Sequence, residues 1–199
     1  MNKLAFIGGS FHCHNNSKLS TFLGPDNLSI IKGGLIVDGN QNLADLITLN
    51  NLDSLGFLDI FTNENLNSLS GFAKLVNISG TARIEYNRNL GSLCGFNNLT
   101  SLIGDLVISN NYTLTSISGF NKLNFISGYL DINDNVALNR LSGFMKLDTV
   151  GALNIIENPS MFSLSGLENC KAINRRLYIS TNDSLNDISA LYNISLACI

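Results

Sequence analysis

Apolar residues recur along this chain with a period of 23 or 24 residues. Within each repeat, an L-x-I segment alternates apolar and polar positions, which predicts a short strand with its Leu and Ile side chains inward. The next apolar residues come at every third position, which suits short extended segments joined by bends better than full helices. The repeats begin at Gly9, Gly33, Gly56, Gly80, Gly104, Gly128, Gly151 and Arg175.

A repeat of this length predicts a solenoid, because one unit cannot bury its own apolar side and needs neighbouring units to cover it. The predicted fold is all-β: a parallel β-helix of about eight leucine-rich coils of 23–25 residues. We expect residues 1–199 to form a single domain. A partial coil at 1–8 precedes coils 9–32, 33–55, 56–79, 80–103, 104–127, 128–150, 151–174 and 175–199.

One polar position is Asn in every coil. Asn tolerates bends, and its side-chain amide both donates and accepts hydrogen bonds. Stacked in register, these amides are expected to point inward and to bind the turn backbone and one another. Two further positions are mostly Gly and mark bends where a Cβ would be costly. The predicted Asn ladder consists of Asn16, Asn40, Asn63, Asn87, Asn111, Asn135, Asn158 and Asn182.

The segments Gly104–Phe120 and Gly128–Asn135 resemble receptor L-domain-type leucine-rich repeats, which occur in growth-factor receptor ectodomains and in many microbial surface proteins. Ordinary leucine-rich repeats are similar, but here the step from Asn to the next Leu is one residue longer, as from Asn63 to Leu66. This departure favours the closed right-handed β-helix of L domains over an open horseshoe. The resemblance implies a scaffold for protein or glycan recognition and supplies no catalytic residues.

Charge and hydropathy exclude two classes of partner. The net charge is −3 and no basic run occurs, so we expect no nucleic-acid partner. The apolar stretches are too short to span a bilayer, so we expect no membrane span. Residues 1–8 lack a full signal-peptide core. An extracellular or cell-surface location is expected from the resemblance and from the N-x-S/T sequons.

Those sequons are common in this Asn-rich chain. Two of them, at Asn111 and Asn182, belong to the predicted ladder and are expected to be poor glycan acceptors. The seven sequons begin at Asn15, Asn27, Asn77, Asn98, Asn111, Asn182 and Asn193.

The outward strand positions carry the candidate binding surface. Aromatic and charged residues are mixed there, which suits a protein or sugar partner, although a plain solvated sheet face is the competing interpretation. The candidate contact residues are Phe57, Asp59, Phe61, Arg83, Tyr129, Asp131, Arg176 and Tyr178.

Two chemical alternatives arise on the same face. Carboxylates Asp59, Glu85 and Asp105 on adjacent coils would suit a β-helix carbohydrate enzyme, but Arg83 beside Asp59 predicts an ordinary cross-strand ion pair. We therefore expect no catalytic residues and a protein that is not an enzyme.

The second alternative is a metal site. His12 and His14 point outward, and Asp38 should lie beside His14 on the next coil. Cys13, between the two histidines, instead belongs to an inward apolar position, so we expect neither a metal nor a cofactor. Cys13 and Cys170 are expected to act as small core hydrophobes. A Cys170–Cys198 disulfide is conceivable in an oxidising compartment but is not favoured.

These observations favour a non-enzymatic recognition or adhesion module of cell-surface type, which binds a protein or glycan through the outward strand face. The alternative is a structural filament or coat protein whose copies stack coil on coil. A β-helix carbohydrate-active enzyme is the third hypothesis.

Overall fold

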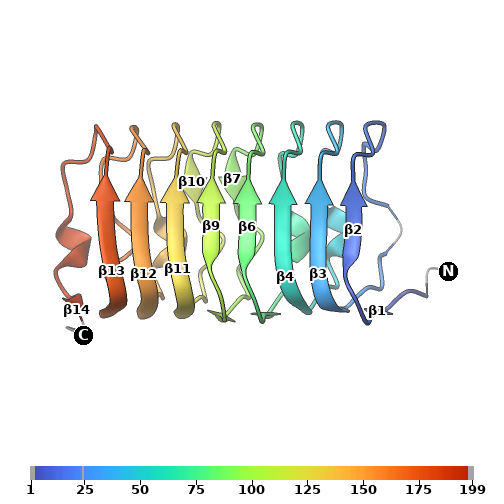
Figure 1. The fold of residues 1–199 in the computed structure, drawn as a ribbon, viewed down its shortest axis with the longest axis horizontal. Coiled ribbons are helices and arrows are strands. Elements are labelled where there is room, and N and C mark those ends of the chain that lie inside the picture. The colour runs from blue at the N-terminus through green and yellow to red at the C-terminus, as the bar shows by residue number, and fades with distance from the viewer. Residues whose placement is uncertain (1–2, 24, 197–199) are drawn as a thin grey trace.

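The computed structural model describes residues 3–23 and 25–196. The chain winds into a parallel β-solenoid, as the repeat predicted, with β2 and β13 near opposite ends of the stack (Figure 1). In the described residues, eight strands lie side by side along its front. These strands are β2 (Phe11–His14), β3 (Ile30–Asp38), β4 (Ser54–Phe61), β6 (Ala82–Glu85), β9 (Leu106–Ser109), β11 (Phe125–Asn133), β12 (Thr149–Ile156) and β13 (Ala172–Ser180).

The strand register confirms the predicted repeat. Phe11 pairs with Leu35 and Leu35 with Leu58, so equivalent residues lie 24 and 23 positions apart, and every pairing is parallel. Short strands β1 (Phe6–Ile7), β5 (Asn77–Ile78), β8 (Ser101–Leu102) and β14 (Ser195–Leu196) continue this sheet around one corner of the coils.

The opposite side of the coils holds a smaller sheet and short helices. Strand β7 (Ser92–Leu93) pairs with β10 (Ser116–Ile117), behind β6 and β9 in Figure 1. In other coils, single turns of 3-10 helix take the place of this strand. They are short, in agreement with the absence of long amphipathic segments from the sequence. They are η1 (Ile47–Leu49), η2 (Ser70–Phe72), η3 (Ser142–Phe144) and η4 (Ser189–Leu191).

The core is a set of apolar columns that run the length of the solenoid. Phe72, Phe96, Phe120 and Phe144 are buried and form a continuous stack, with ring centroids 5.1–5.3 Å apart and nearly parallel planes. Leu and Ile residues from every coil fill the rest. Each coil therefore covers the apolar side of the next, as a solenoid requires.

The inner Asn residues form the predicted ladder. Six of them, from Asn40 to Asn158, are fully buried. Asn111 Nδ2 donates to the carbonyl oxygens of Ile84 (2.9 Å) and Ser109 (3.0 Å), and the Asn111 N–H donates to Asn135 Oδ1 (3.1 Å). The ladder thus satisfies backbone groups at a buried bend where water cannot reach them.

The backbone detail of this bend differs from the sequence prediction. The left-handed residue is not the ladder Asn but the residue before it, for example Thr62 (φ 58°) and Tyr86 (φ 56°). The ladder Asn is selected by its side-chain hydrogen bonds, and the strained conformation falls on its neighbour.

The Gly positions reflect close stacking between coils. A Cβ on Gly95 would overlap the backbone carbonyl oxygen of Leu69, one coil earlier, and a Cβ on Gly71 would overlap that of Leu46. Neither glycine has a positive φ. Glycine is therefore needed here because the coils touch backbone to backbone, more than because the chain bends.

The outermost described coils depart from the predicted inward pattern. Asn16 is exposed and Asn182 is only partly buried. Ile188, which is equivalent to the buried Leu164 of the preceding coil, is 57% exposed, and Cys13 is only half-buried. The physical reason is that these residues have a covering coil on one side only in the described part of the chain.

Candidate functional site on the outward strand face

Strand β4 presents three outward side chains in alternation: Phe57, Asp59 and Phe61. All three are half-buried. The Phe57 ring lies over Gly34 of β3, where any side chain would overlap it. A glycine on one coil thus lets an aromatic ring of the next coil lie against the sheet.

Strand β6 adds two charged residues beside this trio. In the strand register, Arg83 lies opposite Asp59 and Glu85 lies opposite Phe61. Arg83 Nη1 is 3.6 Å from Asp59 Oδ1, and the Arg83 side chain is 53% exposed whereas that of Asp59 is 16% exposed. The predicted ion pair is therefore present, and its acidic member is largely withdrawn from water.

Burial governs the electrostatics of the two carboxyl groups. It raises the pKa of Asp59 above its ordinary value, and the nearby Arg83 guanidinium opposes the increase. Burial also raises the pKa of Glu85; Arg83 opposes this, Asp59 and Asp131 add to it, and a hydrogen bond with Ser109 lowers it. Asp59 Oδ1 is buried, and its 3.6 Å ion-pair contact with Arg83 Nη1 is longer than an ordinary hydrogen bond.

Two shallow hollows meet at this charged pair. One, of about 560 Å³, lies over Gly56 and Gly80 and is bordered by Phe57. The other, of about 260 Å³, is bordered by Phe61 and Glu85. Both are lined by Asp59 and Arg83. The site therefore offers two aromatic walls, an acceptor with spare capacity and a guanidinium donor.

The remaining predicted contact residues form a separate group on the same face. Arg176 stacks over the Tyr178 ring at 4.3 Å from its centroid, and Asp131 accepts a 3.0 Å hydrogen bond from Asn133. Strand β9 separates this group from the first, because it pairs with β6 on one side and β11 on the other. The structure thus divides the predicted surface into two parts.

Sequence reasoning missed one member of the second group. The Arg175 guanidinium lies 5.1 Å from the Tyr129 ring centroid and donates to the Ser127 carbonyl oxygen at 3.1 Å. Arg175 occupies a position that is Gly in every other coil. This departure from the repeat is the sequence signal that distinguishes Arg175.

The structure also shows where the residues of the predicted enzyme and metal-site alternatives lie. Asp105 does not join Asp59 and Glu85 in a shared hollow; its Oδ1 accepts the backbone N–H of Tyr129 at 2.8 Å. His14 lies opposite Asp38 in the strand register. Within residues 3–23 and 25–196, no group of three or more His, Cys, Asp or Glu residues is arranged to hold a metal ion.

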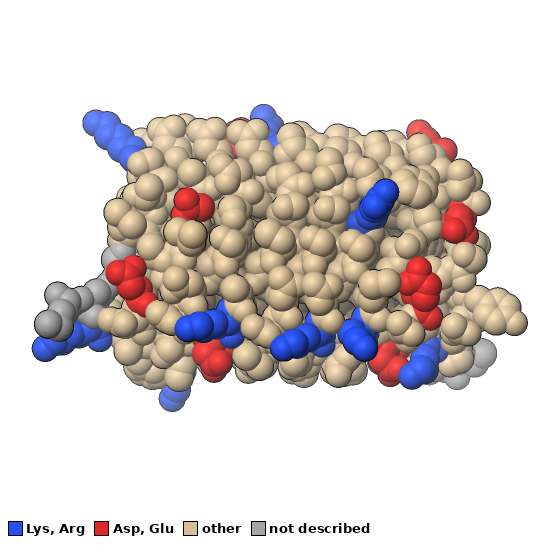
Figure 2. All heavy atoms as spheres, turned by 180° about the vertical axis from the view of Figure 1, so that it is seen from behind, with Lys and Arg blue, Asp and Glu red and all other residues tan. Residues whose placement is uncertain are grey.

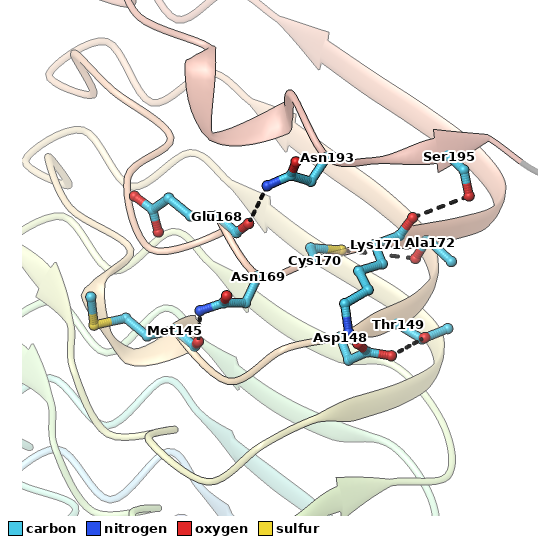
Figure 3. Close-up of polar contacts among 10 residues, drawn as sticks. All are labelled: Met145, Asp148, Thr149, Glu168, Asn169, Cys170, Lys171, Ala172, Asn193 and Ser195. Atoms are coloured by element: carbon cyan, nitrogen blue, oxygen red, sulfur yellow. Dashed lines mark hydrogen bonds and ion pairs between the residues drawn. The ribbon is translucent and has the colours of Figure 1, made fainter.

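A third side of the solenoid is joined by polar bonds between successive coils (Figure 3). Asn169 Nδ2 donates to the Met145 carbonyl oxygen at 2.7 Å, and Lys171 Nζ lies 2.6 Å from Asp148 Oδ1. Cys170 is buried beside them, and burial raises the pKa of its thiol to about 11. The predicted core role of Cys170 is thus confirmed, whereas its pairing with Cys198 lies outside the described residues.

Comparison with protein-family models, with curated proteins and with solved structures found no match. The fold alone defines the class, a parallel β-solenoid, and the resemblance to receptor L domains stays a prediction. In the described part of the chain, no helix is long and apolar enough to cross a membrane.

Proposed function

We propose that this protein is a non-enzymatic recognition or adhesion module of cell-surface type, and that it binds a protein or glycan through the strand-face site of Phe57, Asp59, Phe61, Arg83 and Glu85. The observation that carries the proposal is the Asp59–Arg83 ion pair between two half-buried phenylalanines, in which the buried Oδ1 of Asp59 is 3.6 Å from Arg83 and has no contact within hydrogen-bond distance. A donor group on a ligand would supply the short hydrogen bond that this buried oxygen lacks.

The composition of the site supports a ligand with both apolar and polar faces. Phe57 and Phe61 provide flat apolar contact, and the two carboxylates and Arg83 provide directional hydrogen bonds. The stacked strands hold these side chains at fixed spacing, so little ordering is needed on binding. The resemblance to receptor L domains supports the same proposal, including an extracellular or cell-surface location.

The test combines a glycan array with staining of intact cells by the purified, labelled chain. We expect binding that Phe61→Ala weakens at least about tenfold and that Arg83→Gln also weakens, since loss of a charged hydrogen bond costs about 1.5–3 kcal/mol. Tyr192→Ala is the matched control, because Tyr192 is 90% exposed and lies outside the site. Tyr178→Ala tests whether the second group contributes.

Equal binding by wild type, Phe61→Ala and Arg83→Gln would contradict the proposal. Coil-on-coil self-assembly, the alternative from the sequence, has its own readout: concentration-dependent fibres in electron micrographs that persist in both strand-face variants.

A further inference from the structure

A hollow of about 370 Å³ lies on the side of the solenoid opposite the strand-face site. It spans three successive coils near the C-terminal end and is lined chiefly by Arg140, Phe162, Ser163, Ser165, Asn186 and Asp187. Bridges pair Ser116 with Arg140 and Ser163 with Asp187, which continues the β7–β10 ladder beneath it. Charged side chains are sparse over the middle of this side, and the basic ones gather mainly along one edge (Figure 2).

Two lining residues, Arg140 and Phe162, depart from the repeat at this place. The column that contains Arg140 otherwise holds hydroxyl or Asp residues, namely Thr21, Asp45, Ser68, Ser92, Ser116, Ser163 and Asp187. The column that contains Phe162 otherwise holds only small or polar residues, namely Ser20, Ala44, Asn67, Gly91, Thr115, Asn139 and Asn186. The departures therefore fall on neighbouring coils and line one hollow, which a merely structural repeat does not require.

The two charged groups in the hollow do not neutralise each other. Arg140 and Asp187 are two coils apart, which corresponds to about 10 Å between strands. Arg140 makes no side-chain hydrogen bond or ion pair within the described ranges 3–23 and 25–196. Asp187 is held in place: it accepts from the Ser189 N–H at 2.9 Å and from the Ser163 hydroxyl at 3.2 Å.

Phe162 supplies an apolar wall between polar groups. Phe162 is 44% exposed, whereas the equivalent residues of the other coils are small or polar. An exposed ring beside a free guanidinium, a fixed carboxylate and several hydroxyl and amide groups matches the two faces of a pyranose ring. Aromatic rings stack on the C–H face of such a ring, and polar groups bind its hydroxyls.

We propose that this hollow is a second binding site and that it takes a carboxylate-bearing sugar residue of an acidic oligosaccharide. Arg140 binds the sugar carboxylate through paired N–H donors, as guanidinium groups do with planar anions. Phe162 stacks on the ring, and Asp187 and Asn186 bind hydroxyls at the other end. The site lies across the core from Phe61 and Arg83, so it does not depend on the strand-face proposal.

The test is calorimetric titration of the full chain with oligogalacturonate, oligoalginate and sialyllactose. At least one should bind, and its methyl-ester counterpart should bind at least about tenfold more weakly, because esterification removes the charge that Arg140 recognises. Arg140→Ser and Phe162→Asn restore residues that other coils use at these positions, so both variants should fold. Each should weaken binding at least about tenfold.

Leu23→Ala, an exposed position in the first coil and outside both sites, serves as the control and should bind the acidic sugar like wild type. Weaker binding in Arg83→Gln but not in Arg140→Ser would overturn the inference and assign the sugar to the strand face. No binding of any of the three sugar acids at millimolar concentration would overturn the inference, as would equal affinity for the methyl ester. Tighter binding of polyglutamate that Arg140→Ser abolishes would also overturn it, and would assign the hollow to an acidic peptide. Circular dichroism and thermal melting confirm that each variant is folded.

Discussion

The backbone N–H of Asn87 donates a 3.1 Å hydrogen bond to Oδ1 of Asn111 on the following coil. Both residues are fully buried. Asn111 in turn bonds the carbonyl oxygen of Ile84 on the coil before, so one side chain joins two coils at the corner. The bend is stabilised because this side chain pairs buried backbone groups that lie on both coils.

Removal of an inner ladder amide should therefore be costly. Asn111→Ala leaves the Asn87 N–H without its acceptor and removes the amide donor to the Ile84 carbonyl oxygen, whereas the Ser109 carbonyl oxygen keeps the Tyr86 N–H. At about 1–3 kcal/mol for each unsatisfied buried group, we expect the free energy of unfolding to fall by at least about 2 kcal/mol. Asn16→Ala, at the exposed end of the ladder, should cost less than about 1 kcal/mol. Urea denaturation of both variants measures the difference, and equal losses would contradict the ladder's role.

The left-handed residue before each ladder Asn offers a stabilising substitution. Thr62 has φ 58°, a region that costs a β-branched residue about 1–2 kcal/mol and that Asn tolerates. Asn already occupies the equivalent positions Asn15 and Asn110. We expect Thr62→Asn to raise the free energy of unfolding by about 1 kcal/mol. Thr100→Asn, at an exposed position without positive φ, is the control, and a gain there of the same size would point to a different cause.

Substitutions at Gly91 and Gly95, which lie four residues apart, distinguish the effect of close coil stacking from the effect of glycine flexibility. A Cβ at Gly95 would overlap the Leu69 carbonyl oxygen, whereas a Cβ at Gly91 would have nothing within 4 Å. We expect Gly95→Ala to destabilise the fold by more than about 3 kcal/mol, because two coils must move apart. Gly91→Ala should be neutral or slightly stabilising. Thermal melting of the pair decides the matter; similar melting temperatures would rule out the backbone contact.

The described thiols should react in order of exposure. Cys94 is exposed, Cys13 is half-buried and Cys170 is buried. Burial raises the pKa of the Cys170 thiol to about 11 and also raises that of Cys13, where a hydrogen bond from Asn16 opposes it. Because the thiolate is the reactive form, an aromatic disulfide reagent at neutral pH should label Cys94 first and Cys170 only after denaturation. Mass spectrometry of the labelled peptides gives the order, and rapid labelling of Cys170 in the native protein would be inconsistent with its place in the core.

The pKa values of Glu85 and Asp148 are shifted in opposite directions, so the contributions of these two carboxyl groups to folding stability should change with pH in opposite ways. Burial raises the pKa of Glu85, so the folded state is penalised above that pKa, and stability falls as pH rises through the interval between its unfolded and folded values. We expect Glu85→Gln to be more stable than wild type at neutral pH, with the gap closing as pH approaches about 4.

Asp148 provides the matched comparison. A hydrogen bond from Lys171 holds its pKa below the ordinary value, so its contribution is present at neutral pH and is lost as pH falls through the folded pKa. Asp148→Asn should therefore lower the melting temperature at neutral pH and have little effect in acid. Melting curves of both variants across this pH range test the signs; a destabilised Glu85→Gln at neutral pH would refute the desolvation argument.

Periodicity in the sequence determined the fold of this protein, because residues one coil apart stack on each other and must be compatible. The apolar columns, the strand register and the inward Asn residues could all be predicted for that reason. The outward orientation of Phe61 and Arg83 followed from simple alternation along a strand.

Other features were decided only by the tertiary structure. The positive φ of Thr62, the contact of Gly95 with the Leu69 carbonyl and the place of Phe57 over Gly34 depend on how closely the coils approach. The hollow between Arg140 and Asp187 depends on which side chains leave space across neighbouring coils. A repeat specifies which residues become neighbours, but the distance between backbones and the packing of side chains set what those neighbours can bind.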